Sequence, residues 1–150
     1  MVEINGIRVH EAETVTRLWD EMARATPDGG PLTDRGARKI TRMLRASTAH
    51  PEVFCLVARD GDDIVGFTMG QLTRDPLLPG VGGEVHELYV VPRARGGGVS
   101  RRLADAAIGR LRRMGAGLIW THVCADDRDA HNFWAALGFE GDAIRFALYD

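Results

Sequence analysis

Apolar positions along the chain change their spacing from segment to segment, and each spacing predicts a different element. Between residues 15 and 22 they follow the i, i+3, i+4, i+7 spacing of an amphipathic helix, which the turn-rich residues 27–31 terminate. A second helix is expected after Thr33, whose hydroxyl can cap it, and a third between Val99 and Gly115. The predicted apolar stripes are Val15, Leu18, Trp19 and Met22, then Ile40, Met43 and Leu44, then Val99, Leu103, Ala107 and Leu111.

Segments rich in β-branched and apolar residues separate these helices and predict strands. A short strand is expected near Ile7–Val9. Residues 53–58 and 64–72 should form two antiparallel strands, because Asp60-Gly61 between them is a strong hairpin signal. Further strands are expected at residues 84–91, 118–123 and 143–149.

The order of the later elements predicts how the sheet is built. A strand at 84–91, a helix and a strand at 118–123 follow one another with short connections, so a right-handed crossover should make the two strands parallel neighbours. A last helix, with the stripe Ala130, Phe133, Trp134 and Leu137, should stop at Gly138. The fold class is therefore α/β, with a mixed sheet that is antiparallel at first and then parallel, flanked by helices.

Length and charge limit the organisation and the partners. A chain of 150 residues, 45% of them hydrophobic, suits a single domain over residues 1–150, and the turn-rich stretch 74–83 reads as a loop inside it. A net charge of −2 gives no whole-molecule attraction for nucleic acid. The arginines between residues 93 and 113 are either a solvated helix face or a local anion site, with nucleic-acid binding as a minor alternative.

The sequence also favours a soluble protein of the cytoplasm. No apolar run approaches the ~20 residues that span a bilayer, and the first residues lack a cationic start followed by an apolar stretch. Cys55 and Cys124 lie in apolar segments without CxxC spacing, so both are expected to be buried thiols. No recognised ligand spacing links His122 and His131 to nearby aspartates, so no metal is expected.

A glycine-rich turn, Arg95-Gly96-Gly97-Gly98-Val99-Ser100, opens the third predicted helix. A helix N-terminus offers unpaired N–H groups and about half a positive charge, which favour a bound phosphate. The glycines permit close approach, and Arg95, Arg101 and Arg102 add positive charge. A Walker loop would need Lys before Ser or Thr, and GxGxxG is absent. Taken alone, the turn fits a phosphate site and a simple tight connection equally well.

The surrounding residues make the turn more specific. The run Glu84-Val85-His86-Glu87-Leu88-Tyr89-Val90-Val91-Pro92, followed by Arg95 to Ser100, resembles the signature of the GNAT N-acetyltransferase superfamily. Arg95 and Gly98 match that signature, whereas Ser100 stands where the family has Gly or Ala. Downstream, Trp134 and Leu137-Gly138-Phe139 resemble the end of the family's last helix.

This resemblance implies a GNAT fold with a centrally splayed sheet, and acetyl-coenzyme A as cosubstrate. The main chain of the segment Leu88, Tyr89 and Val90 would pair with the pantetheine arm, with residues 121–124 as the opposite wall. Asp127 and Trp134 are also expected among the residues that bind the cofactor. Asp127 stands where the family commonly has a pantetheine-binding asparagine, and Trp134 where many relatives have a tyrosine that protonates the departing thiolate. The pyrophosphate would be held by Arg95, Gly96, Gly97, Gly98, Val99, Ser100 and Arg101.

The resemblance further implies direct acetyl transfer to an amine, which needs a base. Glu84 is the preferred general base, His86 the second candidate, and solvent or Tyr89 the acid. Strand alternation predicts that Glu84 and His86 share one face, with Glu87 and Tyr89 on the other unless the strand is bulged.

Several questions stay open at this point. The acceptor could be a small primary amine, such as an aminoglycoside or polyamine that acids of the N-terminal helices would attract, or a protein amino group. The alternative function is a binding module that has lost catalysis. Dimers are common in the family, so the choice between monomer and homodimer stays open. The acids in question are Asp20, Glu21, Asp28 and Asp34.

Overall fold

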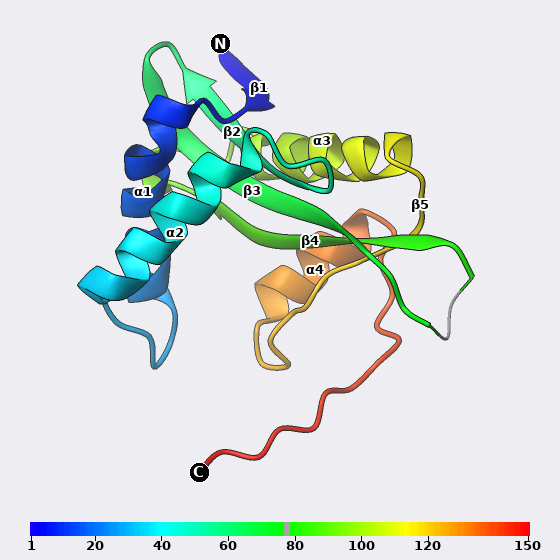
Figure 1. Ribbon diagram of the computed structural model, residues 1–150. Coiled ribbons are helices and arrows are strands. Elements are labelled where there is room, and N and C mark those ends of the chain that lie inside the picture. The colour runs from blue at the N-terminus through cyan, green and yellow to red at the C-terminus, as the bar shows by residue number, and fades with distance from the viewer. Residues whose placement is uncertain (77–78) are drawn as a thin grey trace.

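The computed structural model describes residues 1–76 and 79–150. Within this part of the chain, five strands form one sheet in the order β1-β2-β3-β4-β5 (Figure 1). The first four are antiparallel neighbours and β5 runs parallel to β4, as the crossover predicted. The elements are β1 (Val2–Gly6), α1 (Ala12–Ala25), α2 (Asp34–Ser47), β2 (Val53–Asp60), β3 (Asp63–Thr73), β4 (Val81–Val90), α3 (Val99–Arg113), β5 (Ala116–Trp120) and α4 (Arg128–Ala136), with short 3-10 turns at Val9–Glu11 and Pro92–Ala94.

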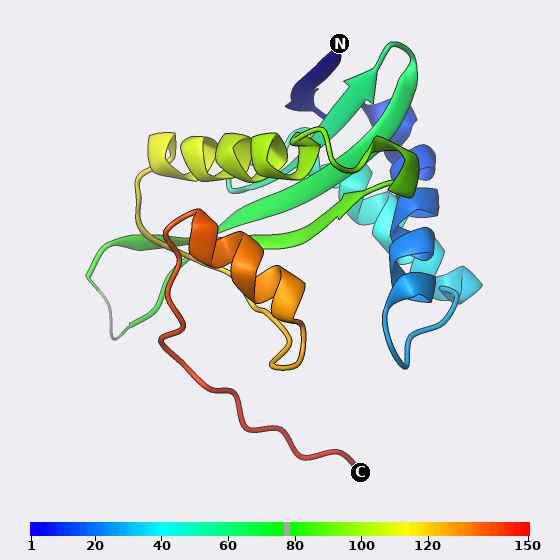
Figure 2. The same cartoon turned by 180° about the vertical axis from the view of Figure 1, so that it is seen from behind.

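Helices cover the sheet on both faces. Helices α1 and α2 lie together on one face, while α3 and α4 lie on the other, as Figures 1 and 2 show from opposite sides. The core between these layers includes the predicted stripe of α3, whose Val99, Leu103, Ala107 and Leu111 are all buried. The fold class predicted from the sequence is therefore confirmed.

The two N-terminal helices form much as their patterns predict. The N–H group of Gly36 donates to the hydroxyl of Thr33 at 3.0 Å, which caps α2. Leu44 is fully buried, but Met43, which was placed in the same stripe, is 38% exposed. The stripe on α2 is narrower than predicted because this helix packs mainly against α1, with smaller contacts to β2 and to the 3-10 turn at Val9–Glu11.

The β2–β3 hairpin is confirmed, whereas the first strand lies earlier than predicted. Gly61 takes a φ of 61° in the turn between Asp60 and Asp63. β1 ends at Gly6, and the predicted segment Ile7–Val9 is not a strand, although the N–H group of Ile7 donates to the carbonyl of Cys55 at 3.0 Å. Val9 is 54% exposed and opens a 3-10 turn that leads into α1.

Three further boundaries differ from the prediction. Residues 81–83 belong to β4 rather than to the predicted 74–83 loop, of which residues 77–78 lie outside the described part. β5 covers Ala116–Trp120 and stops before Thr121, so the predicted 118–123 strand is too late. The predicted strand at 143–149 is wrong, because these residues pair with no other strand in the described chain and are exposed.

A β-bulge in β4 changes which side chains share a face. Thr68 of β3 faces Leu88, but Met69 faces His86, so Glu87 is an extra residue without a partner. Glu87 has a φ of 47°, in the left-handed region. The alternation predicted for this strand is therefore wrong beyond His86. The facing residues Gln71, Met69 and Phe67 alternate along β3, so their partners Glu84, His86 and Tyr89 lie on one face of the sheet.

The two cysteines differ in exposure. Both cysteines are free thiols; Cys55 is buried as predicted, but Cys124 is exposed, because it lies beyond the end of β5. Burial raises the pKa of the Cys55 thiol to about 12, so this group stays protonated. Within the described residues, no helix is both long and apolar enough to cross a membrane.

Candidate functional site

The sheet opens between its two parallel strands. Pairing of β4 with β5 ends at Glu84 and Trp120, and residues 85–90 of β4 continue without a strand partner on that side. The hydroxyl of Thr121 donates to the carbonyl of Val85 at 2.7 Å, where the opening begins. An extended ligand can therefore bind along the free edge of β4 as an added strand would.

The glycine-rich turn places a set of free donors at the same end of the sheet. Gly96 and Gly98 have φ values of 88° and 80°, which only glycine adopts readily, and Gly98 begins α3 without a side-chain cap. The first backbone bond of α3 runs from Arg102 to Gly98. Within the described chain, the main-chain N–H groups of residues 96–101 make no hydrogen bond, so they remain available to an anion.

The three arginines predicted at this turn differ in direction. The Nε of Arg95 donates to the carbonyl of Val90 at 2.8 Å, and its guanidinium lies 5.5 Å from the ring centre of Tyr89. Arg101 is exposed, with a long contact of 3.8 Å to Asp105 one turn along. Arg102 donates to the carbonyl of Val2 in β1. Arg95 and Arg101 therefore stay beside the turn, while Arg102 ties α3 to the first strand.

Four titratable side chains lie on β4 and just after β5, near the point where the two strands part. Glu84 lies with an oxygen 3.8 Å from the Nδ1 of His122, which the chain places just after β5. Burial lowers the pKa of His86, although the charge of Glu84 opposes this, and its Nε2 is buried without a hydrogen bond in the described structure. Burial and the charge of Glu84 raise the pKa of Glu87. Glu84 therefore influences the pKa of both neighbours on its strand, and a carboxylate beside a neutral imidazole can accept and pass protons.

The bulge adds Tyr89 to the face that carries Glu84 and His86. Its side chain is 7% exposed, and the hydroxyl donates to a carboxylate oxygen of Glu21 on α1 at 3.4 Å. Burial and the charge of Glu21 raise its pKa. Tyr89 also contacts Phe67, which stacks on Trp19 of α1. The hydroxyl is thus held against α1, rather than in the gap between the two parallel strands.

Asp127 and Trp134 hold α4 in place. The carboxylate of Asp127 accepts a hydrogen bond from the N–H group of Ala130 at 3.0 Å and so caps the helix. Trp134 is 9% exposed and packs edge-on against Phe133 and Phe139, with ring centres 5.1 and 4.9 Å apart. Trp134 therefore belongs to the core, as the helical stripe predicted.

Some members of the site have only weak signals in the sequence. The resemblance placed His122 in the wall opposite β4, but its side chain was weighed there only as a metal ligand, and no group of three or more candidate ligands in the described residues is arranged to hold a metal ion. Glu87 becomes part of the cluster only through the bulge, which no local pattern announces. Thr121 was expected inside a strand, whereas its hydroxyl bridges the opening. Because the β4–β5 pairing ends at Trp120, Thr121 and His122 lie beside the opening instead of inside a strand.

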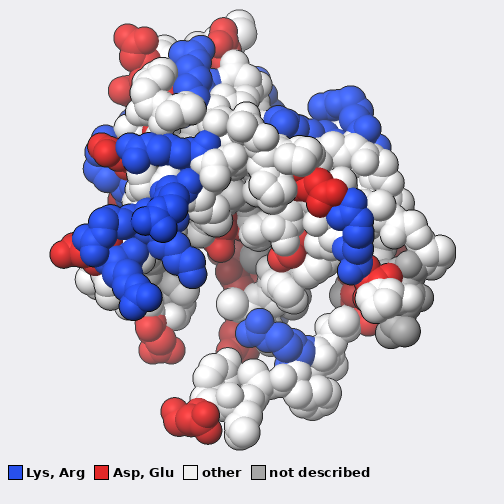
Figure 3. All heavy atoms as spheres, viewed as in Figure 1, with Lys and Arg blue, Asp and Glu red and all other residues white. Residues whose placement is uncertain are grey.

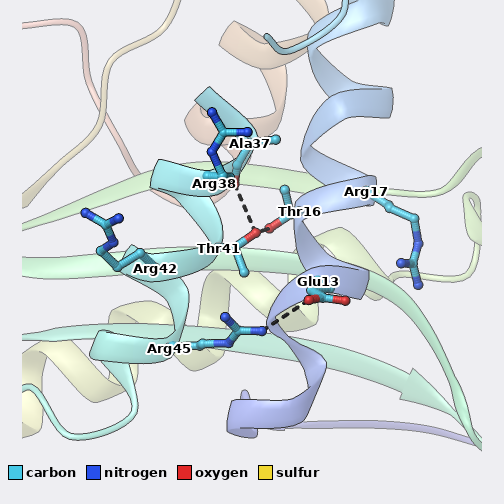
Figure 4. Close-up of a pocket in the computed structure, with 8 residues that line it drawn as sticks. All are labelled: Glu13, Thr16, Arg17, Ala37, Arg38, Thr41, Arg42 and Arg45. Carbon is cyan, nitrogen blue, oxygen red and sulfur yellow. Dashed lines mark hydrogen bonds and ion pairs between the residues drawn. The ribbon is translucent and has the colours of Figure 1, made fainter. Parts of the chain in front are cut away.

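A hollow of about 540 Å³ lies between α1 and α2, away from the candidate site. Figure 4 shows Thr16 and Thr41 meeting at its centre, where their hydroxyls lie 2.7 Å apart. The surrounding arginine side chains spread outward instead of converging, and Arg45 contacts Glu13. This hollow lacks a set of groups directed at one ligand.

A family model matches the part of the chain that contains most of the fold and the glycine-rich turn. Residues 15–139 match the acetyltransferase (GNAT) family, which covers most of the chain and includes the whole candidate site. The chain belongs to this family. The predicted resemblance is therefore confirmed, and acyl transfer is the activity that the family supports.

One curated protein and several solved structures are similar to this chain. A mycothiol acetyltransferase of Renibacterium salmoninarum is 31% identical over 86 residues, which are 57% of this chain but only a quarter of that protein. A transcriptional regulator from Bacillus halodurans superposes with a TM-score of 0.83 at 18% identity, covering both chains fully. A ribosomal-protein-alanine N-acetyltransferase from Brucella melitensis biovar Abortus gives 0.75 at 16%, covering 100% of this chain and 99% of that one. These structures share the fold.

Proposed function

We propose that this protein is an N-acetyltransferase that moves the acetyl group of acetyl-coenzyme A directly to an amine. The observation that carries the proposal is the set of free N–H groups at residues 96–101 beside the unpaired edge of β4. A pyrophosphate can accept hydrogen bonds from these N–H groups, and an extended chain that carries amides can pair with the edge of β4. Coenzyme A contains both groups, and its acetyl thioester supplies an activated acyl group.

The glycine-rich turn and the edge of β4 are the proposed binding groups for coenzyme A. The main chain of Gly96 to Arg101 would bind the pyrophosphate, with the side chains of Arg95 and Arg101 adding charge. Cβ atoms at the three glycines would meet no other atom within 4 Å, so the space in front of the turn is open. The edge of β4 at Leu88–Val90 would pair with the pantetheine arm.

A general base is the largest chemical need of the reaction. An alkylamine with a pKa near 10.4 is about one part in a thousand neutral at pH 7.4, a cost of about 4 kcal/mol. Glu84 would accept the amine proton, directly or through water, because its side chain reaches the opening and lies against His122. His86 is the second candidate, because its lowered pKa keeps the imidazole neutral and able to take a proton.

Protonation of the departing thiolate needs less help from the protein than deprotonation of the amine does. A thiol with a pKa near 8.5 leaves far more easily than an amine is deprotonated. Trp134 is buried and cannot titrate, and the hydroxyl of Tyr89 is directed to Glu21 with a raised pKa. Solvent in the open gap is therefore the proposed acid, with Tyr89 as the alternative.

The acceptor is proposed as a small-molecule primary amine or a protein amino group. Two of the acids that favoured an aminoglycoside or polyamine are engaged, since Asp20 contacts Arg24 and the N–H group of Leu32, and Glu21 contacts Tyr89. Lys and Arg instead gather over α2, as Figure 3 shows. The acceptor panel should therefore include neutral and acidic amines, and a peptide with an N-terminal alanine, as one structural relative's name suggests.

Thermal stabilisation by acetyl-coenzyme A tests the donor site. A ligand at 100 times its dissociation constant adds about 2.7 kcal/mol, so the unfolding temperature should rise by several degrees. Arg101→Gln should weaken binding, whereas the matched variant Arg112→Gln, in the last turn of the same helix, should not. The absence of any stabilisation at millimolar ligand would reject the proposal, and release of free thiol with the amine panel tests turnover.

A second candidate is a module that binds acyl-coenzyme A without catalysis. It is favoured by Trp134, which is buried where relatives have a tyrosine, and by Asp127, whose carboxylate is committed to capping α4. Stabilisation by the ligand together with no thiol release across the panel would support this function. Turnover with any one amine would exclude it.

A further inference from the structure

One face of α2 carries most of the charge of that helix. Each of its five basic residues lies three or four positions from another, so together they occupy about a third of the helix circumference over a length of about 15 Å. All five side chains are exposed. These residues are here called the basic face of α2: Arg35, Arg38, Lys39, Arg42 and Arg45.

Acidic side chains of the protein leave most of this charge unpaired. In the described residues, Arg45 is the only member of the basic face with an ion pair, an exposed contact of 3.2 Å to Glu13 of α1. In α1, by contrast, Arg24 pairs with Asp20 one turn away. Like charges three or four positions apart destabilise a helix. The basic face therefore has a cost in stability that an anionic partner would remove.

The hollow between α1 and α2 runs along the basic face. Arg38, Arg42 and Arg45 line it from α2 and Arg17 from α1, and Figure 4 shows these side chains spread apart. A small anion would meet only one or two of them, whereas an extended ligand can contact several at once. Figure 3 shows that basic side chains gather over this part of the surface. The basic face therefore fits a ligand about as long as the face itself.

The charge of the rest of the chain limits the class of partner. α2 carries five basic residues and Asp34, a net charge of +4, so the other residues together carry −6 of the chain's total of −2. A long polyanion such as nucleic acid would extend past α2 and be repelled by this negative remainder. A membrane-binding helix inserts its apolar face, but Leu44 on the apolar side of α2 is buried inside the protein. A short acidic segment of a protein meets neither obstacle.

We propose that the basic face of α2 binds an acidic segment of a partner protein, about six residues long and rich in Asp and Glu. An extended segment of this length spans about 20 Å, enough to cover the face. Guanidinium groups bind carboxylates through two parallel hydrogen bonds, which suits a face built mainly of arginine. Because α2 packs against β2, two strands away from β4, a bound segment leaves the opening between β4 and β5 free.

Fluorescence anisotropy tests the binding and its place on the full chain. The probe is an N-acetylated, C-terminally labelled peptide with about six consecutive glutamates, and its control has glutamines instead. At about 50 mM salt the glutamate peptide should bind at least about 10-fold more tightly, and about 0.5 M salt should remove the difference. Arg38→Gln combined with Arg42→Gln should weaken binding about 10-fold. The matched pair Arg112→Gln and Arg113→Gln, in the last turn of α3, should change it less than about two-fold.

Lys39 allows the bound peptide to be located, because it is the only lysine of the chain. A carbodiimide activates a carboxyl group of the probe, and the amine of Lys39 then forms an amide with it while the carbodiimide leaves as a urea. Mass spectrometry of the digested product should find the probe on Lys39. Lys39→Arg, which keeps the charge, should retain the binding and lose this cross-link.

The stability of the variants tests whether the unpaired charges have a cost. Arg38→Gln combined with Arg42→Gln should unfold at the same urea concentration as the wild type or at a higher one, because like-charge repulsion along α2 is reduced. A clear loss of stability would show that these arginines support the fold instead of a partner, and would overturn the proposal.

Three further results would overturn it. Equal weakening by the two double variants would show that the probe responds only to net charge. A cross-link to the N-terminal amine of Met1 and none to Lys39 would place the probe elsewhere. Displacement of the probe by duplex DNA or phosphatidylserine vesicles at a lower concentration of charge would assign the face to nucleic acid or to a membrane. Thermal stabilisation by acetyl-coenzyme A is measured separately in the same variants, so failure of the docking and failure of the proposed activity are distinguishable.

Discussion

Substitution of Glu87 tests the strain at the bulge of β4. A residue with a Cβ atom pays about 1–2 kcal/mol in the left-handed region, and Glu87 has a φ of 47°. Glu87→Gly removes this cost together with the whole side chain, whereas Glu87→Ala removes the side chain beyond Cβ and keeps the cost. Glycine also has more conformational freedom in the unfolded chain, which offsets part of this gain in stability. The Gly variant should therefore be more stable than the Ala variant by about 1 kcal/mol.

The assay is urea unfolding at pH 7, followed by circular dichroism, supported by thermal unfolding. For a chain of this length, 1 kcal/mol corresponds to about 2–4 °C in the unfolding temperature. Equal stability of the Gly and Ala variants would refute the reasoning, since it would mean that the left-handed backbone carries no cost. Far-UV spectra of both variants must match that of the wild type.

The carboxyl group of Glu87 adds a pH dependence with a defined sign. Its folded pKa is raised above the ordinary 4.5, by burial first and then by the charge of Glu84. The favourable protonated form is fully present below pH 4.5, and its contribution is lost as the pH rises through the raised pKa. Glu87→Gln should therefore gain stability over the wild type at pH 7 and show no such gain at pH 4. A gain that is equal at both values would contradict the assignment.

Three other substitutions test separate parts of the structure. Glu84→Gln should lower turnover about 100-fold at neutral pH, and an unchanged pH–rate profile would transfer the role of base to His86 or water. Arg59→Met should cost about 3–5 kcal/mol in urea unfolding, because the Nε of Arg59 donates to buried Glu11 at 2.9 Å, and the double variant with Glu11→Leu should recover much of it. Since Arg59 lowers the pKa of Glu11, this pair's contribution is present above pH 4.5 and lost as the pH falls through the lowered pKa. Asp127→Ala should lose about 1 kcal/mol by removing the cap of α4, and Asp127→Asn should restore it, both measured by urea unfolding.

Elements with strong local signals were predicted well from the sequence. The cap at Thr33, the turn at Gly61 and the apolar stripe of α3 each depend on residues close together in the chain. The crossover from β4 to β5 also follows from short connections alone. The prediction of the last strand at 143–149 used the same kind of signal and was wrong, because alternation shows that a segment can pair but not where its partner lies.

The sequence by itself determined the fold class, the family and the position of the glycine-rich turn, because periodicity, turn chemistry and the motif around Arg95 are local properties of the chain. Only the tertiary structure decided which side chains meet. The bulge at Glu87 arises from the pairing of β4 with β3, and it moves Tyr89 to the face of Glu84. The end of the β4–β5 pairing brings His122 to Glu84 across 38 residues. Contacts between distant strands depend on register, and register is a property of the whole sheet rather than of either segment.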